Sequence, residues 1–168
     1  ILELEGFGII SADTAFGGDS FVMVDAQKLG FAIEPSEAAD LARLGAKITD
    51  AATEQIGFHH PVISDWEHYS FCQFSSMENF AEDCITFKSA VSVKPGKIDR
   101  SPTGTALSAK MAVLEARDEL KVGQRLKAVS IIGSTFEGRI LEKCRVNETP
   151  AIIPEISGRA WITGCLLY

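Results

Sequence analysis

The sequence predicts an α+β fold in which mostly antiparallel strands surround a buried helix. About eight short segments are rich in β-branched and aromatic residues, and turn residues separate most of them. Only two segments have helical spacing, and strands and helices do not alternate, which argues against a doubly wound parallel sheet. One of the two predicted helices is apolar around most of its circumference, and such a helix is buried.

The first third of the chain predicts a pair of strands followed by an amphipathic helix. In FGIISADTAFGGDSFVMVDA, two apolar runs flank Gly17 and Gly18, where a positive φ costs little, so we expect two short strands with a tight turn. Ser36 is a suitable cap for a helix that runs to about Gln55, because apolar residues are spaced along one face of this segment.

The remaining elements are one helix and several short strands. WEHYSFCQF (66–74) and CITFKSAVSV (84–93) have the composition of strands. A helix is expected from Gly104 to about Leu120, and its central part is polar only at Ser108 and Lys110. Four more strands are predicted in LKAVSIIG (126–133), TFEGRIL (135–141), AIIPEI (151–156) and RAWITGCLL (159–167). The natural arrangement is a sheet curled around the apolar helix, whose first turn opens onto a cavity or an interface.

Composition excludes several functional classes. The 168 residues suit one mid-sized domain, and 46% hydrophobic with 23% charged residues is ordinary for a globular protein. The net charge of −7 and the lack of a basic run argue against a nucleic-acid partner. No segment approaches the ~18 consecutive apolar residues of a membrane span, and the start lacks the basic region of a signal peptide. We therefore expect a cytoplasmic protein without a membrane partner.

No metal site or other cofactor site is predicted. The cysteines are far apart, and none is at ligand spacing from a histidine, so we expect reduced, buried thiols at Cys72, Cys84, Cys144 and Cys165. His59 and His60 are adjacent in a segment expected to be extended, where neighbouring side chains point to opposite faces. A shared metal ligand is therefore not expected, and we interpret this pair as part of a solvated loop.

The start of the second helix has the residues of a binding site for a zwitterion. The first turn of a helix has unpaired N–H groups that hold anions, and here Thr103, Gly104 and Thr105 form that turn. Gly104 allows a ligand to approach the backbone closely. Asp99, a few residues upstream, can accept hydrogen bonds from a cationic group. This pairing of an anion site with a carboxylate is the pattern expected for an amino acid.

A purely structural interpretation of the same residues is also open. Asp99 and Ser101 can serve only to cap the helix, and Pro102 is suited to its first turn. The segment also lacks the Gly-Lys-Ser or Gly-Lys-Thr ending of a phosphate-binding loop. The residues alone leave the ligand site and the simple cap as alternatives.

The segment DRSPTGTALSAKMAVL (99–114) resembles the proline racemase family, whose pattern here is Asp-Arg-Ser-Pro-Cys-Gly-Thr-Gly followed by a Ser-Ala helix. DTAFGGDSFVMVDAQ, VGQRLKAVSIIGSTFEGRI and SGRAWITG extend the resemblance over essentially the whole chain, in the same order. The resemblance implies the diaminopimelate-epimerase-like fold, in which two similar lobes each wrap strands around a central helix. It also implies an active site between the lobes, where both helix N-termini face the substrate carboxylate.

The chain departs from this pattern in two ways. The family's first catalytic cysteine lies in a Cys-Gly-His motif of an N-terminal lobe, and this motif is absent from the sequence. We therefore expect residues 1–168 to be a single lobe, the C-terminal half of a two-lobe enzyme, with an N-terminal lobe that carries the catalytic Cys as its partner. The start at Ile1 and the apolar ending WITGCLLY also suggest part of a longer polypeptide. The second departure is Thr103, which occupies the position of the second catalytic cysteine.

The resemblance, together with Thr103, implies a dehydratase. Racemisation needs an acid and a base on opposite faces of Cα, and a threonine hydroxyl does not ionise as a thiol does. A single base can still dehydrate trans-3-hydroxy-L-proline to Δ1-pyrroline-2-carboxylate without a cofactor. By the resemblance, backbone N–H groups of Gly104 and Thr105 bind the substrate carboxylate, and Asp99 accepts from the ring nitrogen. Thr103 is then a hydrogen-bond donor beside the departing hydroxyl and a candidate proton relay.

Two alternatives stay open. One is a proline or hydroxyproline racemase or epimerase homologue whose chemistry has changed, and Thr103 argues against it. The other is a non-catalytic amino-acid-binding lobe that acts as a partner domain. Whether the enzyme is a dehydratase or a racemase, the chain alone is expected to be inactive, because its candidate site has no base. The sequence does not determine the oligomeric state, and a homodimer is compatible with it.

Overall fold

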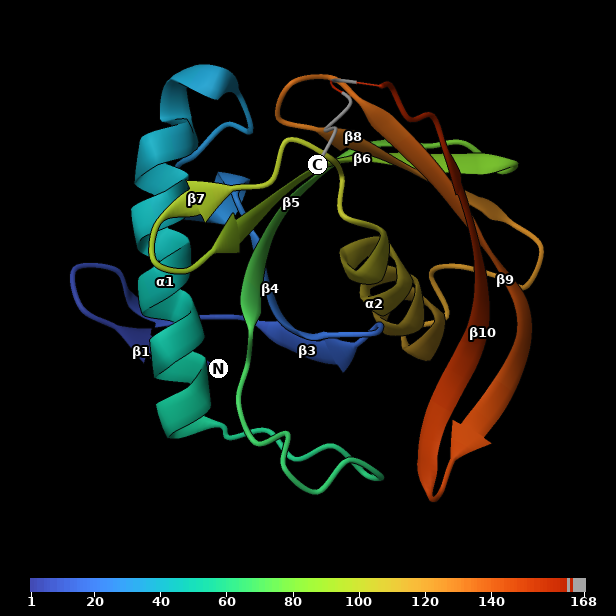
Figure 1. Cartoon of the computed structure of the whole chain (residues 1–168), viewed down its shortest axis with the longest axis horizontal. Helices are drawn as coiled ribbons and strands as arrows, with labels where there is room; N and C mark the ends of the chain where they lie inside the picture. Colours follow the sequence, from blue (N-terminus) through green and yellow to red (C-terminus); the bar gives the residue numbers. More distant parts are fainter. Residues whose placement is uncertain (163, 165–168) are drawn as a thin grey trace.

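The computed structural model describes residues 1–162 and 164, and a mixed eight-stranded sheet dominates it (Figure 1). The sheet has the order β10-β9-β8-β6-β5-β4-β3, with β7 paired to β6, and β1 and β2 form a separate antiparallel pair. The elements are β1 (Leu2–Leu4), β2 (Gly8–Ile10), β3 (Asp13–Phe16), β4 (Ser20–Asp25), α1 (Ala38–Gln55), β5 (Phe71–Phe80), β6 (Cys84–Val93), β7 (Lys97–Ile98), α2 (Gly104–Ala116), β8 (Arg125–Ser130), β9 (Thr135–Val146) and β10 (Thr149–Gly158), with 3₁₀ turns at Gln27–Leu29 and Pro35–Glu37. The prediction of an α+β chain with mostly strands and few helices is confirmed.

Each α-helix is the crossover connection of a parallel strand pair. β4 and β5 are parallel and α1 joins them, while β6 and β8 are parallel and α2 lies in the connection between them. Parallel strands need such long connections, whereas the other pairs in the sheet are antiparallel. Figure 1 shows α1 on the outer face of the curved sheet and α2 within its curve.

The two helices pack on opposite faces of the same strands. In β4, Val22 and Val24 join the core around α1, whereas Phe21 and Met23 join the core around α2. Successive side chains of a strand point to opposite faces, so a strand covered on both faces is apolar at every position. This explains why the segment FVMV has no polar residue and why both of its faces are buried.

Helix α2 is buried, as its apolar composition predicts. Leu107 and Met111 are fully buried in a cluster with residues of β6, β8 and β9, and Ala106 and Ala109 face Phe21 of β4. The helix ends at Ala116, not near Leu120 as predicted. Asp118 has a φ of 59°, in the left-handed region, and this residue redirects the chain out of the helix.

The predicted cap of α1 is wrong, although its end at Gln55 is confirmed. The helix begins at Ala38 after the 3₁₀ turn Pro35–Glu37, and it has no side-chain cap. The Ser36 hydroxyl donates to the Glu34 carboxylate at 2.7 Å instead. The extra turn displaces Ser36 from the position at which it could accept from the first N–H groups of the α-helix.

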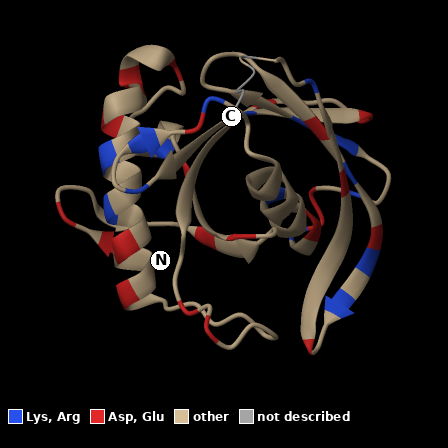
Figure 2. Cartoon of the chain, viewed as in Figure 1, with Lys and Arg blue, Asp and Glu red and all other residues tan. Residues whose placement is uncertain are grey.

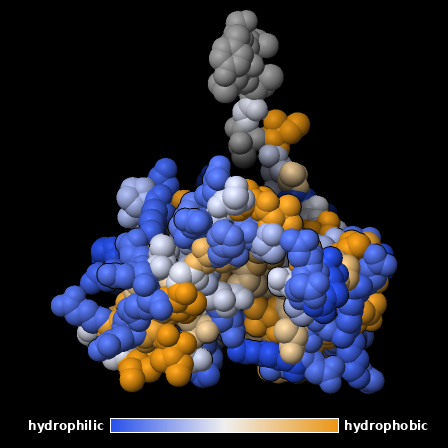
Figure 3. Space-filling model, turned by 90° about the horizontal axis from the view of Figure 1, so that it is seen from below, coloured by the Kyte–Doolittle hydropathy of each residue, from blue (hydrophilic) through white to orange (hydrophobic). Residues whose placement is uncertain are grey.

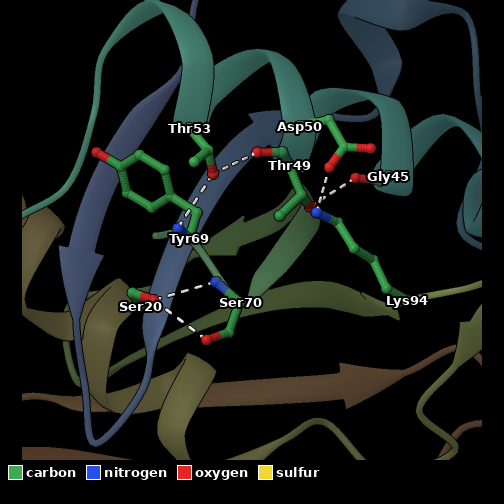
Figure 4. Close-up of polar contacts among 8 residues, drawn as sticks. All are labelled: Ser20, Gly45, Thr49, Asp50, Thr53, Tyr69, Ser70 and Lys94. Carbon is green, nitrogen blue, oxygen red and sulfur yellow. Dashed lines mark hydrogen bonds and ion pairs between the residues drawn. The ribbon is translucent and has the colours of Figure 1, made fainter. Parts of the chain in front are cut away.

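The predicted strand at 66–74 begins only at Phe71, because the residues before it surround Ser20. The Ser20 hydroxyl donates to the His68 carbonyl at 2.7 Å and accepts from Trp66 Nε1 at 3.0 Å. Figure 4 shows Ser20 and Ser70 in hydrogen-bond contact beside the Thr53–Tyr69 bond, which ties this segment to α1. These bonds fix an irregular path that aromatic content alone does not reveal.

The other strand predictions have mixed outcomes. The β3–β4 pair around Gly17 and Gly18 is confirmed, and β6 spans the predicted residues 84–93. The last predicted strand, 159–167, does not form among its described residues, and residues 163 and 165–167 of it lie outside the described part of the chain. Cys165 lies outside the described part as well.

The charged residues are distributed over the surface. Figure 2 shows acidic and basic residues interspersed along α1 and along the β9–β10 hairpin, without one large basic patch in this view. Their ion pairs are largely exposed, for example Arg139 with Glu155 at 2.7 Å, and such pairs contribute little to stability. Within residues 1–162 and 164, no helix is long and apolar enough to cross a membrane.

Lys110 is an exception, because its charged group is buried between α2 and the sheet. Its side chain is 6% exposed, and Nζ donates to the Ser75 hydroxyl at 3.3 Å. Burial lowers the pKa of Lys110 below its ordinary value, and nearby Asp13 partly opposes this effect. The unfolded chain therefore binds this proton more tightly, so folding stability should rise with pH up to about 10.4, the usual lysine pKa.

Replacing Lys110 with Met should increase stability at neutral pH, because it removes a buried charge and keeps much of the side-chain volume. We expect the free energy of unfolding to increase by about 1–3 kcal/mol and to lose its rise toward pH 10. Urea titrations of the chain at pH 7 and pH 9.5 measure both effects. Lys47→Met, on the exposed face of α1, is the matched control and should change little. Lower stability of the Lys110→Met variant at pH 7 would contradict this account.

Candidate functional site

The residues predicted to form a site are brought together in the turn that leads into α2. Asp99 Oδ1 accepts from the Ser101 N–H at 2.9 Å. Asp99 Oδ2 accepts from the Ser101 hydroxyl at 3.0 Å and from the Thr103 hydroxyl at 2.6 Å. The turn itself is anchored to the sheet, because the Asp99 N–H donates to the Val91 carbonyl at 2.9 Å. The Asp99 carboxylate and the Thr103 hydroxyl therefore form one connected unit.

Thr103 has an unusual backbone conformation at the start of the helix. Its φ and ψ are 62° and 107°, a region that a β-branched residue rarely adopts. The Thr103 N–H donates to the Ser101 hydroxyl at 3.1 Å, and its carbonyl accepts from Leu107 at 3.0 Å. Backbone strain of this kind is concentrated at functional sites, where the surrounding structure holds the residue in place.

The first N–H groups of α2 are available to a ligand. In the described part of the chain, the N–H groups of Gly104, Thr105 and Ala106 have no hydrogen-bond acceptor, and no side chain caps the helix. Among the described residues, a β-carbon at Gly104 would meet only Ile156 Cδ1, at 3.9 Å, so no described atom crowds this residue. Three unpaired donors at the positive end of a helix can hold an anion such as a carboxylate.

The purely structural interpretation of these residues is wrong in its details. Asp99 and Ser101 do not accept from the helix N–H groups; they bond to each other and to Thr103. Pro102 is buried and precedes the helix, which begins at Gly104. The side chains that could cap the helix are thus used to hold Thr103, and the donors of the first turn remain unpaired.

Gly17 and Gly18 form the β3–β4 turn, which packs directly against the first turns of α2. A β-carbon at Gly17 would be 2.2 Å from the Thr105 carbonyl oxygen and 2.5 Å from the Ala109 nitrogen, both backbone atoms. Gly18 has a φ of 102° and lies against the Thr105 side chain. Thr105 is therefore held by contacts between the β3–β4 turn and the first turns of the helix.

Replacing Gly17 with Ala should destabilise the chain and move the β3–β4 turn away from α2. The added methyl group meets backbone atoms that cannot rotate away, so we expect a loss of about 1–3 kcal/mol in urea unfolding. Gly96→Ala is the matched control, because a β-carbon there meets no atom within 4 Å. If the two variants are equally stable, the β3–β4 turn has room for a β-carbon at Gly17 and does not lie as close to α2 as described.

A groove lies along the flank of α2 rather than at its start. This groove, of about 800 Å³, is bounded by β3, the segment 58–61, the outer face of α2 and β10. The view from below shows hydrophobic residues at the centre of this face with hydrophilic residues on both sides (Figure 3). Asp99 and residues 103–105 do not line it, so we treat the groove as separate from the candidate site.

Two residues differ from their sequence-based interpretation. His60, interpreted as solvated, is 9% exposed, and its Nδ1 accepts from the N–H groups of Val62 and Ile63. His59 is exposed, so the two histidines do not form a common site. Ser101 was interpreted only as a cap, yet it contacts both Asp99 and Thr103. The position of Ser101 between Asp99 and Thr103 in one short turn is the sequence signal that could have indicated this role.

The described residues show neither a metal cluster nor an accessible thiolate at the site. No group of three or more His, Cys, Asp or Glu residues that could hold a metal ion is present among residues 1–162 and 164. Cys72 is fully buried, as predicted, and burial raises the pKa of its thiol, so it stays protonated. Cys84 and Cys144 are only partly buried, which corrects the prediction for these two.

The family model described as proline racemase matches residues 1–168, and the chain belongs to this family. The family prediction is thereby confirmed.

Two solved structures are similar to the chain. One is a probable proline racemase from Agrobacterium radiobacter K84 with bound carbonate, at 32% identity and a TM-score of 0.87, covering 94% of this chain and 45% of the other. The second is a hydroxyproline epimerase from Agrobacterium vitis with bound trans-4-hydroxy-L-proline, at 32% identity and a TM-score of 0.89, covering 97% and 46%. The chain thus spans less than half the length of these relatives.

Proposed function

We propose that residues 1–168 are the C-terminal lobe of a cytoplasmic, cofactor-independent dehydratase that converts trans-3-hydroxy-L-proline to Δ1-pyrroline-2-carboxylate. In this proposal the lobe has the diaminopimelate-epimerase-like arrangement, and an N-terminal lobe supplies a cysteine thiolate. The family membership and the similarity to a hydroxyproline epimerase support an amino-acid substrate with a pyrrolidine ring. Carbonate, bound by the other relative, is a planar oxyanion like a carboxylate.

The observation that carries the proposal is a hydroxyl group at Thr103, where the family pattern resembled by this segment has a thiol. The Thr103 hydroxyl is bonded to Asp99 at 2.6 Å, and no other titratable side chain of the turn contacts it. A hydroxyl group in this setting cannot serve as the second proton-transfer base that racemisation requires. It can assist the departure of a hydroxyl from the ring atom next to Cα, which needs only one base.

The roles of the remaining site residues follow from the contacts at the helix start. The unpaired N–H groups of Gly104 and Thr105 hold the substrate carboxylate and stabilise the charge that develops when Cα loses its proton. Asp99 accepts from the ring nitrogen. Thr103 lies beside the hydroxyl at C3. The thiolate of the other lobe removes the Cα proton from the opposite side.

The experiment uses the intact parent polypeptide, incubated separately with trans-3-hydroxy-L-proline and with L-proline. We expect formation of the cyclic imine from the first and constant optical rotation of the second. Residues 1–168 alone should form no imine, since in this proposal the group that removes the Cα proton belongs to the other lobe. Turnover by this fragment would contradict the two-lobe proposal.

The same measurement distinguishes the alternatives. Loss of the optical rotation of L-proline would favour a racemase or epimerase in which another group replaces the second thiol. If the intact polypeptide forms no imine and causes no change in rotation, while it still binds proline in calorimetry, a non-catalytic amino-acid-binding lobe is favoured. Sedimentation of the same sample tests whether it is a homodimer.

A further inference from the structure

We propose that the groove along the flank of α2 is the docking site of an apolar segment of the parent polypeptide that lies outside residues 1–168. This segment packs its side chains between the two edge strands β3 and β10 and places a backbone carbonyl against His60. The proposal needs a parent polypeptide longer than this chain, as the two-lobe proposal does, but it does not depend on the dehydratase activity. It concerns a surface separate from the candidate site at the start of α2.

The groove exposes a flank of α2 that the described part of the chain does not cover. The sheet curls around the helix and ends at β3 and at β10, and Figure 1 shows these two strands on either side of α2. Ala112, Val113 and Ala116 line the groove between them, and Ala116 is exposed. A helix that is apolar around most of its circumference is ordinarily covered on all sides. This flank is therefore suited to a permanent cover rather than to water.

The walls of the groove are largely apolar, and the acidic and basic groups in it are paired. Aromatic, aliphatic and proline side chains contribute to both walls: Phe16, Phe58, Pro61, Val146, Ile152 and Pro154. Among the described lining residues, Asp13 and Arg117 are the acidic and basic ones, and they form an ion pair with each other. The volume of about 800 Å³ has room for several side chains. An apolar surface of this kind favours an uncharged, apolar polypeptide segment as its occupant.

His60 places an unpaired donor in this apolar groove. The residue lines the groove and is only 9% exposed. Its Nδ1 accepts from the N–H groups of Val62 at 3.1 Å and Ile63 at 2.9 Å. A ring nitrogen that accepts carries no proton, so the ring proton is on Nε2, which has no acceptor among the described residues. Because buried polar groups are ordinarily hydrogen-bonded, we expect the occupant to supply an acceptor here, and a backbone carbonyl fits.

Two observations favour a segment of the same polypeptide over a second copy of the chain. The two solved relatives match 94% and 97% of this chain but only 45% and 46% of their own length, so a parent polypeptide of their length has further chain to cover the groove. A second copy would most simply add a strand to the edge strand β10. Pro150 and Pro154 lack the N–H donors for this, and they can only occupy positions whose backbone nitrogen faces away from β9. We therefore expect docking through side chains.

Thiol alkylation in the intact parent polypeptide tests the proposal. Ala116→Cys introduces a thiol in the groove, and Ala39→Cys, the matched control, introduces one on α1. Both alanines are exposed helix residues in the described chain, so similar alkylation rates are expected if nothing covers the groove. We expect iodoacetamide to modify the Ala116→Cys thiol at least about tenfold more slowly, because alkylation then requires local opening of the docked segment. Mass spectrometry of the peptides separates these sites from the native cysteines.

Four outcomes would overturn the proposal. Similar rates for the two variants in the intact polypeptide would mean that the groove is open. Protection of the Ala116→Cys thiol that persists in residues 1–168 alone would mean that the cover belongs to this chain. Protection that is lost on dilution of the intact polypeptide would indicate a second copy, and protection that is lost after unfolding, dialysis and refolding would indicate a dissociable small molecule. Alkylation does not depend on turnover, so protection without imine formation supports the docking site while the dehydratase function fails.

Discussion

Replacing Thr103 with Cys in the parent polypeptide is expected to produce racemisation of L-proline, which the unsubstituted protein should not catalyse. A thiol at this position adds a second proton-transfer group, with an ordinary pKa of about 8.5 that a helix N-terminus lowers. Positioned acids and bases typically contribute about 10²- to 10⁴-fold, so we expect racemisation to rise by that range above the background rate without a second base. Loss of optical rotation of L-proline over time is the measurement.

The same variant should be impaired with trans-3-hydroxy-L-proline, because the hydrogen bond from Thr103 to Asp99 is lost. Thr103→Ser, which introduces no base, is the control and should not racemise proline. If Thr103→Cys folds normally and still leaves the rotation unchanged, residue 103 does not face Cα. That outcome would contradict the placement of the substrate at the start of α2.

Truncation of Leu107 to Ala should cause a large loss of stability for a single substitution in this chain. Leu107 is fully buried in α2 and packs in a cluster with Phe87, Leu126 and Ile140 from three different strands. Removal of such a side chain leaves a cavity that the sheet on this side cannot close, and losses of about 2–5 kcal/mol are typical. Guanidinium unfolding, followed by circular dichroism, measures the change.

Val122→Ala provides the comparison, since the Val122 side chain is 48% exposed. Its effect should stay within about 0.5 kcal/mol. If the two variants lose equal amounts of stability, the helix is packed less tightly against the sheet than its burial indicates. A loss confined to Leu107→Ala supports α2 as the centre of the core.

Local composition correctly predicted several elements, because it favours the same structure in almost any tertiary context. β6 spans the predicted residues 84–93, because a run of β-branched and aromatic residues with turns on both sides forms a strand in almost any context. The burial of α2 was predicted for a similar reason, since its apolar circumference must be covered on all sides. The strands β3 and β4 were recognisable from the paired glycines between them.

Where prediction failed, contacts or backbone conformations that composition does not reveal replaced the expected structure. Residues 66–70 are rich in aromatic residues, yet hydrogen bonds to Ser20, 46 residues away from Trp66, hold them outside the sheet. Ser36 bonds to Glu34 rather than to the helix that follows. Asp118 adopts a left-handed backbone conformation and ends α2 earlier than predicted. The spacing of apolar residues does not indicate this conformation.

The candidate site, too, was predicted from the sequence only in part. Asp99, Thr103, Gly104 and Thr105 lie within seven consecutive residues, so the sequence by itself determined that a carboxylate, a hydroxyl and a helix start would be close together. It also determined which family the chain belongs to, because the motif of that family is continuous along the chain.

Only the tertiary structure decided how these groups are used. It directs the hydroxyl protons of Ser101 and Thr103 to one oxygen of Asp99, leaves the first N–H groups of α2 unpaired, and brings Gly17 against Thr105. The direction of a hydrogen bond and the close approach of Gly17 to Thr105 both depend on separations of a few tenths of an ångström. Residue identity alone does not carry that information, whereas the packing of the sheet around α2 does.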